Sequence, residues 1–230
     1  MEQKTIIITG VSKGIGLETV KKFISKEWSV IGLGRNNPEI NHPYFKFIPC
    51  EISKYASVQQ AVASALEYSK GNVDVLLNNA GFGTFGSITD LPIEKWEGMF
   101  QVNVHGLMYV TREVVPAMKK NQSGHIINIS SIAGLNGIVN GSGYAATKHA
   151  VKGISHSLYA ELRTDGIKVT AVYPGSVKTN FFDEVDGITA NDNMLDPKDV
   201  AEAIWYLANT SPNFLPVDFE IRPLNPNTKK

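Results

Sequence analysis

The stretch from residue 5 to residue 16 decides the fold class. It reads Thr5-Ile6-Ile7-Ile8-Thr9-Gly10-Val11-Ser12-Lys13-Gly14-Ile15-Gly16. The β-branched run predicts a strand buried on both faces, and the apolar positions that follow, up to Ile24, have helical spacing. Glycines between a strand and a helix permit a tight turn and let a phosphate approach the free N–H groups of the helix. The spacing is Gly-x-x-x-Gly-x-Gly, which on its own is also compatible with a purely structural turn.

The rest of the chain repeats this alternation of strand and helix. Further strands are predicted at 29–33, 45–48, 73–77, 125–129, 168–173 and 217–221, and helices at 15–24, 56–68, 93–120, 144–162 and 197–207. Such alternation indicates parallel strands with helices on both faces, which is a doubly wound α/β fold. We expect a single domain over residues 1–224 and a frayed tail at 225–230. The irregular stretch 180–195 is interpreted as a lid over the substrate.

Composition excludes several classes of protein. The 230 residues fit one core, and 22 basic residues balance 22 acidic ones, so no global charge favours nucleic acid or acidic lipid. The single cysteine, Cys50, excludes an intramolecular disulfide and a cysteine metal cluster, and no metal site is predicted. The apolar run near the start is too short for a signal peptide, and no run approaches the ~20 residues of a membrane span. A cytoplasmic protein without a nucleic-acid or membrane partner is expected.

The residue after the second strand indicates which dinucleotide binds. A carboxylate there would bond the adenosine ribose of NAD and repel a 2′-phosphate. This sequence has Gly34 and Arg35 instead, and a guanidinium pairs with phosphate through forked hydrogen bonds. Lys13 in the glycine turn is a second candidate for the same phosphate. The alternative is that both are ordinary solvated bases. NADP(H) is therefore favoured over NAD(H).

Tyr144 and Lys148 are the candidate acid–base pair. Four residues apart on one helix, they share a face, and an ammonium near a phenol is expected to lower the pKa of the tyrosine. Such a pair alone is more often a surface contact. Its context is a set of polar or glycine-rich turns after four strands, namely the glycine turn, 78–81, 130–131 and 174–179. Because the carboxyl ends of parallel strands meet at one edge, these turns converge where ligands bind.

Together these motifs resemble the short-chain dehydrogenase/reductase family, over almost the whole chain. The matching motifs are Thr-Gly-x-x-x-Gly-Ile-Gly (9–16), Asn-Asn-Ala-Gly (78–81), a helix asparagine (Asn103), a serine before the tyrosine (Ser131), Tyr-x-x-x-Lys (144–148) and Pro-Gly-x-x-x-Thr (174–179). The resemblance implies a Rossmann-type fold. It also implies an NADP(H)-dependent oxidoreductase that moves a hydride between the cofactor and a carbonyl/alcohol pair.

The resemblance also implies a role for each catalytic residue. Tyr144 would exchange a proton with the substrate oxygen, and Ser131 would hydrogen-bond the same oxygen. Lys148 would bind the nicotinamide ribose and lower the pKa of Tyr144. Asn103 would hold a water that connects Lys148 to solvent; the alternative is a buried asparagine that bridges helix and sheet.

The predicted cofactor-binding set combines the glycine turn, Arg35 and the family motifs. Its members are Gly10, Ser12, Lys13, Gly14, Ile15, Gly16, Arg35, Glu51, Ile52, Asn79, Ala80, Gly81, Tyr144, Lys148, Pro174, Gly175, Val177 and Thr179. Asn79, Ala80 and Gly81 would line the adenosine ribose, and Val177 and Thr179 would hold the carboxamide. Many relatives have an aspartate where this chain has Glu51, so the adenine contact of Glu51 stays open.

The substrate is predicted only as a small carbonyl or alcohol with apolar or aromatic character. Five apolar residues flank the expected cleft: Phe82, Phe85, Leu135, Phe181 and Phe182. Core or lid packing is the alternative for them. Family members pair the helices 93–120 and 144–162, so a homodimer or homotetramer is expected. Two other functions were weighed: a catalytically silent NADP(H)-binding sensor, and an α/β enzyme of different chemistry such as a methyltransferase, which would leave Tyr144 and Lys148 unexplained.

Overall fold

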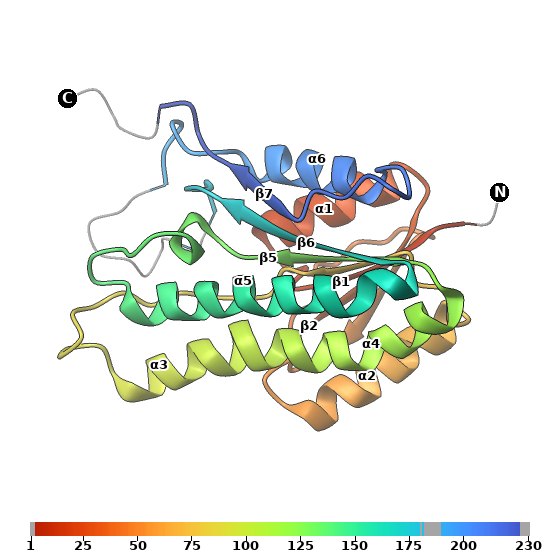
Figure 1. Ribbon diagram of the computed structural model, residues 1–230, viewed down its shortest axis with the longest axis horizontal. Helices are drawn as coiled ribbons and strands as arrows, with labels where there is room; N and C mark the ends of the chain where they lie inside the picture. The colour runs from red at the N-terminus through yellow and green to blue at the C-terminus, as the bar shows by residue number, and fades with distance from the viewer. Residues whose placement is uncertain (1–2, 180, 182–189, 226–230) are drawn as a thin grey trace.

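Within residues 3–179, 181 and 190–225, which the computed structural model describes, seven parallel strands form one sheet in the order β3-β2-β1-β4-β5-β6-β7 (Figure 1). The strands are β1 Thr5–Thr9, β2 Ser29–Gly34, β3 Phe45–Pro49, β4 Val75–Asn78, β5 Gly124–Ile129, β6 Ile167–Pro174 and β7 Asp218–Ile221. The α-helices are α1 Gly14–Ile24, α2 Tyr55–Tyr68, α3 Ile93–Phe100, α4 Leu107–Asn121, α5 Ser142–Leu162 and α6 Pro197–Ala208. The predicted doubly wound α/β fold is confirmed.

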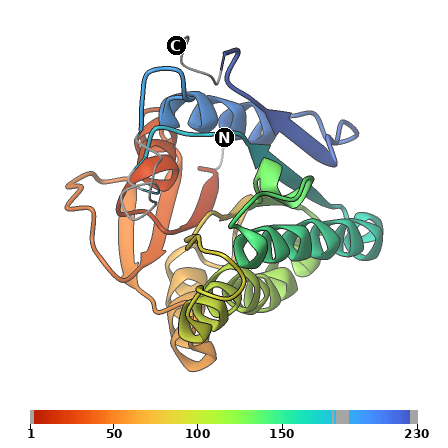
Figure 2. The same ribbon diagram turned by 90° about the vertical axis from the view of Figure 1, so that its left-hand side faces the viewer.

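Different helices cover the two faces of the sheet because successive strand residues point to opposite sides. On β1, Ile6 and Ile8 pack in one apolar cluster with α1 and α6, whereas Ile7 packs in a second cluster with α2, α4 and α5. Figure 2 shows these two helical layers on either side of the sheet. Every residue of β1 is buried, which is why its sequence is apolar without alternation.

The winding of the chain places the predicted motifs at one end of the molecule. Because β1 pairs with β2 on one side and β4 on the other, the winding direction reverses next to β1. A parallel sheet of this kind opens a crevice at the carboxyl ends of its strands, at the point of reversal. The turns that follow β1, β4, β5 and β6 all lie at that end, which faces the viewer in Figure 2.

The predicted continuous helix 93–120 is wrong in its middle. The chain forms α3, then a π-helical segment Gln101–Gly106, then α4. The π turn is centred on Asn103, whose buried side chain bonds outside its own helix. Such wide turns occur mostly where a helix must present a residue at a functional site. Pro116 lies inside α4 without ending it.

Two predicted segments fall largely outside the described residues. Of the lid 180–195, residues 180 and 182–189 lie outside, and of the tail, 226–230 lie outside. The base of the lid segment is described: Val177 forms a parallel bridge with Leu195, and the Leu195 N–H donates to the Ser176 carbonyl at 2.9 Å. Among the described helices, none has the length and apolarity to cross a membrane.

Candidate active site

The glycine turn is shaped by close contacts that exclude side chains. Gly10 and Gly14 have positive φ angles of 74° and 59°, which L side chains rarely adopt. A Cβ on Gly10 would lie 2.8 Å from the Cα of Ala80, and one on Gly16 would collide with the carbonyl oxygen of Gly10. No side chain of the described residues caps the start of α1. Its first N–H groups are therefore available to a phosphate, and the turn fits a dinucleotide.

Asn79 supports this turn from behind. Its Nδ2 donates to the carbonyl oxygens of Thr9 and Gly10, at 3.0 Å each. In return, Thr9 Oγ1 accepts the backbone N–H groups of Asn79 and Ala80, also at 3.0 Å. The Asn79 side chain thus fixes the loop, so the predicted contact with the ribose would have to come from the backbone of this segment.

Ser131, Tyr144 and Lys148 come together at the carboxyl end of β5. Ser131 caps a short 3₁₀ helix, Ile132–Gly134, by accepting the Ala133 N–H at 3.1 Å, and its hydroxyl also hydrogen-bonds Tyr144. Lys148 Nζ donates to the Ile129 carbonyl at 2.9 Å and lies 5.7 Å from the centre of the Tyr144 ring. Both α5 residues are buried, so the pair is no surface contact.

The expected lowering of the Tyr144 pKa is wrong for this structure. Burial raises the pKa of Tyr144 to about 12, and only the Ser131 hydrogen bond works in the other direction. Burial also lowers the pKa of Lys148, to about 8. Desolvation penalises both charged forms, and here it outweighs the attraction between ammonium and phenolate. Tyr144 is therefore held as a neutral phenol that retains its proton.

Asn103 connects the site's two sides. Its Oδ1 accepts the Phe82 N–H at 3.0 Å, and its Nδ2 donates to the Phe82 carbonyl at 2.8 Å and to Thr147 Oγ1 at 3.1 Å. Thr147 in turn donates to the Tyr144 carbonyl at 2.8 Å. The side chain thus bridges the loop after β4 to α5, which is close to the alternative of a buried asparagine that bridges helix and sheet. Holding a water for Lys148 would fall to its backbone.

Ser130 and Thr147 position the pair, and the sequence analysis did not assign them this role. Ser130 Oγ donates to the Lys148 carbonyl at 2.9 Å and is buried, so it ties the end of β5 to α5 at Lys148. Thr147 holds α5 from the side of Asn103. The only sign of this role in the sequence is that Ser130 directly precedes Ser131 and Thr147 directly precedes Lys148.

The residues expected near the adenosine lie beyond β2 and β3. The Arg35 side chain is 75% exposed, and its Nη1 is 3.9 Å from Glu51 Oε2. Lys13 and Ser12 are also exposed, at the glycine turn. Ile52 differs, because its side chain is buried against Gly106 in the π segment. Only the backbone of Ile52 is available to a ligand.

The turn after β6 reaches across to the glycine turn. Gly175 donates its N–H to the Ile221 carbonyl at 2.7 Å, which anchors the start of the turn to β7. At its end, Thr179 Cγ2 lies 3.2 Å from where a Cβ on Gly14 would be. Pro174 and Val177 are buried between these points. The structure therefore brings the 174–179 motif beside the turn that follows β1.

Aromatic rings surround the Tyr144 phenol. The ring centres of Phe85 and Phe181 lie 5.6 Å and 5.3 Å from that of Tyr144. Phe82 and Trp96 pack on the same cluster, over the buried Met99. The predicted pocket residue Phe182 lies outside the described residues. The Tyr144 ring is thus bordered by apolar side chains.

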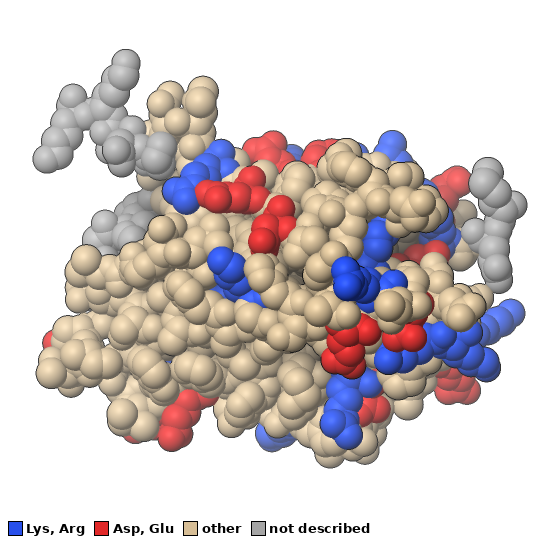
Figure 3. All heavy atoms as spheres, in the orientation of Figure 1, with Lys and Arg blue, Asp and Glu red and all other residues tan. Residues whose placement is uncertain are grey.

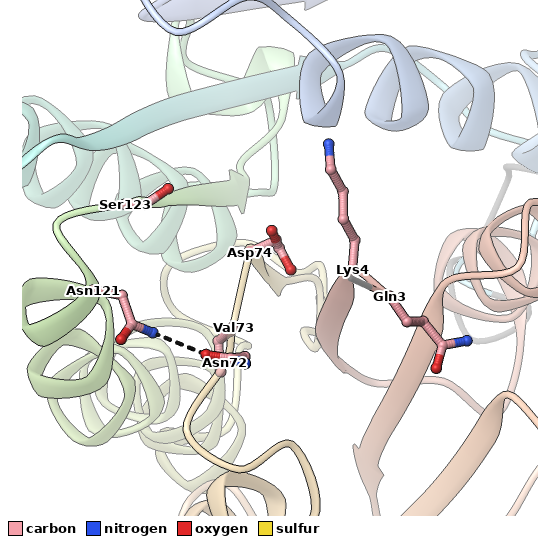
Figure 4. Close-up of a pocket in the computed structure, with 7 residues that line it drawn as sticks. All are labelled: Gln3, Lys4, Asn72, Val73, Asp74, Asn121 and Ser123. Carbon is pink, nitrogen blue, oxygen red and sulfur yellow. Dashed lines mark hydrogen bonds between the residues drawn. The ribbon is translucent and has the colours of Figure 1, made fainter. Parts of the chain in front are cut away.

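A separate hollow of about 160 Å³ lies at the opposite, amino edge of the sheet (Figure 4). It is lined by Gln3, Lys4, Asn72, Val73, Asp74, Asn121 and Ser123, which come just before β1, β4 and β5. Asn121 Nδ2 donates to Asn72 Oδ1 at 3.5 Å across it. None of the predicted site residues lines this hollow. Among the described residues, no cluster of His, Cys, Asp and Glu could hold a metal.

Comparison with known proteins agrees with this geometry. The family profile described as short chain dehydrogenase matches residues 4–187. The chain belongs to this family. This short chain dehydrogenase is 30% identical, over 231 residues, to a Staphylococcus epidermidis protein named an uncharacterized oxidoreductase. The alignment covers 97% of this chain and 99% of that protein. A Staphylococcus aureus protein of the same name is 32% identical over 238 residues, with the same coverage.

Solved structures of related dehydrogenases superpose on the whole chain. The closed form of a serine dehydrogenase complexed with NADP⁺ is 30% identical, with a TM-score of 0.88 over 98% of this chain and 99% of that one. A 3-ketoacyl-(acyl-carrier-protein) reductase from Brucella melitensis complexed with NADH is 27% identical, with a TM-score of 0.87 over 98% and 99%. This short chain dehydrogenase is thus an oxidoreductase with the Rossmann-type sheet that was predicted.

Proposed function

We propose that this protein is an NADP(H)-dependent reductase of uncharged carbonyl compounds, working through Tyr144. The observation that carries the proposal is the meeting of Ser131 with the buried side chains of Tyr144 and Lys148 at the carboxyl end of β5. A silent cofactor sensor would have no use for a buried phenol hydrogen-bonded to a serine.

The chemistry follows from the protonation state of each group. The substrate oxygen would sit between Ser131 Oγ and the Tyr144 hydroxyl, accepting a hydrogen bond from each. When bound, the nicotinamide supplies the hydride to the carbonyl carbon. Tyr144 then gives its phenolic proton to the alkoxide that develops, and the Lys148 ammonium stabilises the phenolate left behind. Lys148 would also hold the ribose of the cofactor.

The cofactor preference is part of the proposal. Arg35 is exposed at the end of β2, where the 2′-phosphate of NADP would lie. The serine dehydrogenase relative is named as a complex with NADP⁺, and the Brucella relative as one with NADH. The family therefore does not decide the cofactor, and the choice rests on Arg35 and Lys13.

Replacing the phenol tests the assignment of Tyr144. Tyr144→Phe should lower kcat by about 10²–10⁴-fold, because it deletes the proton donor. NADPH binding, measured by quenching of protein fluorescence, should stay within about twofold, since the ring remains to pack against the cofactor.

Tyr159→Phe is the matched control for this experiment. Tyr159 lies on the same helix and packs against the core and Arg163, away from Ser131. It should keep wild-type turnover. Substantial carbonyl reduction by Tyr144→Phe would overturn the proton-transfer role, and failure of the wild type to bind NADPH or NADH would overturn both the enzyme and the sensor readings.

A further inference from the structure

Three large aliphatic side chains are exposed on the two loops that carry residues of the candidate site or lead into α5. Ile88 is 72% exposed, Ile138 37% and Val139 91%. Ile88 belongs to the loop after β4, and the other two to the loop before α5, and the two loops are joined by a hydrogen bond from the Gly86 N–H to the Asn140 carbonyl at 2.7 Å. We call Ile88, Ile138 and Val139 the apolar rim. Exposed apolar groups gathered on joined loops mark a surface that another apolar group covers.

The apolar rim is continuous with the surroundings of Tyr144. The Phe85 ring contacts that of Tyr144, with 5.6 Å between the ring centres. Phe85 and Ile138 also meet over Gly141: a Cβ there would lie 3.3 Å from Cδ1 of Phe85 and would collide with Ile138. An unbroken apolar path thus runs from the phenol, past Phe85 and Ile138, to Val139 at the surface.

No charge interrupts this path. Residues 82–89 and 132–143, which carry the rim together with Phe82 and Phe85, contain no Asp, Glu, Lys or Arg. In Figure 3, the left-hand edge of the molecule below the grey atoms, where the two loops project, is almost entirely free of blue atoms. A carboxylate or phosphate on the substrate would be desolvated here without a partner.

From this continuity we infer that the substrate is an uncharged carbonyl compound with an extended apolar body. Its carbonyl would lie at Tyr144, and its apolar chain would run past Phe85 and cover the apolar rim. The inference rests on the proposed function, which it deepens by naming the substrate class. Full burial of a methylene is worth about a fourfold gain in binding, at ~0.8 kcal/mol each, so partial burial on the rim gives roughly twofold.

A homologous series of methyl ketones, from butanone to 2-decanone, tests the inference with NADPH as the reductant. We expect kcat/KM to rise by roughly two- to fourfold for each added methylene. Val139→Asp should lower kcat/KM for 2-decanone by at least about tenfold, while that for butanone stays within about twofold, because butanone does not reach the rim. Since Val139 is almost fully exposed, the variant should fold normally.

Phe214→Asp is the control, because it too replaces an exposed apolar residue with a carboxylate. It lies in the loop after α6, whose Ser211 carbonyl accepts a hydrogen bond from Lys168 near the start of β6, at the other end of the sheet. The Phe214→Asp variant should leave kcat/KM unchanged for every ketone of the series.

The outcomes separate the inference from the proposed function. If butanone is reduced but kcat/KM does not rise with chain length, the inference is overturned and the proposed function stands. The same holds if Val139→Asp slows all ketones equally. If no ketone of the series is reduced although NADPH binds, both are overturned.

Discussion

At the scale of single residues, burial decides what each group can do. Lys148 and Tyr144 are side by side, yet desolvation moves the pKa of the lysine down to about 8 and that of the tyrosine up to about 12. A sequence cannot show this, because the i, i+4 spacing is the same in a buried pair and an exposed one. Arg35 is the opposite case: its side chain is 75% exposed and is paired only loosely, at 3.9 Å, with Glu51. The role proposed for it rests on its place directly after β2.

Reversing the charge at Arg35 should change the cofactor preference. Arg35→Asp is expected to lower kcat/KM for NADPH by roughly 10–100-fold, since hydrogen bonds to a charged group are worth about 1.5–3 kcal/mol. NADH lacks the 2′-phosphate, so its kcat/KM should change by less than about threefold. Steady-state kinetics with both cofactors measures this. Lys26→Asp, the same charge change in the turn before β2, is the control, and equal losses for the two cofactors would remove Arg35 from the phosphate site.

At the scale of elements, the sequence predicts which helices and strands exist better than it predicts the breaks within them. All seven strands were predicted, because apolar β-branched runs alternate with helical periods and turns. The break of the long helix into α3, a π segment and α4 was not, since it depends on where Asn103 finds partners: Phe82 and Thr147 are distant in sequence. The site motifs could be predicted because each is local. Ser130 could not, because its partner is a backbone carbonyl on α5.

The face shared by α4 and α5 belongs to the same scale, because neither helix alone defines it. A groove of about 420 Å³ runs between them, lined by Met108, Thr111, Arg112, Val115, Pro116, Lys119, Ile154, Leu158, Glu161 and Leu162. We propose that a second copy of the chain covers this groove. Its mixture of apolar residues with Arg112, Lys119 and Glu161 is typical of an interface with a polar rim.

A carboxylate in the groove should separate the copies. Leu158→Asp is expected to shift the mass measured by light scattering from a multiple of 25.1 kDa to 25.1 kDa, because the interface would bury an unpaired charge. Tyr68→Asp, which replaces an exposed aromatic residue on α2, should leave the mass unchanged. A wild-type protein of 25.1 kDa would refute the proposed assembly.

At the scale of the whole molecule, the two ends of the sheet serve different purposes. The carboxyl end carries the candidate site, whereas the amino end is held by buried polar contacts. His125, 3% exposed at the start of β5, shares a 2.8 Å hydrogen bond with Thr170 Oγ1, and Thr170 donates to the Pro216 carbonyl at 2.7 Å. Thr170 uses its hydrogen for Pro216, so His125 Nε2 is the donor in the bond to Thr170. Its Nδ1 has no hydrogen-bond partner among the described residues.

This histidine should make the stability of the whole fold depend on pH. Burial, with Lys168 nearby, lowers the pKa of His125 to about 3, while in the unfolded chain it is about 6.5. Between these values the unfolded state binds the extra proton, so the free energy of unfolding falls as pH drops below about 6.5, by up to ~1.4 kcal/mol per unit. From pH 6.5 to 4.5, urea unfolding should show the wild type losing about 2–3 kcal/mol more than His125→Gln, which keeps a donor for Thr170. Parallel losses in the two proteins would mean that His125 takes up its proton without unfolding, and that the amino end of the sheet tolerates a buried charge.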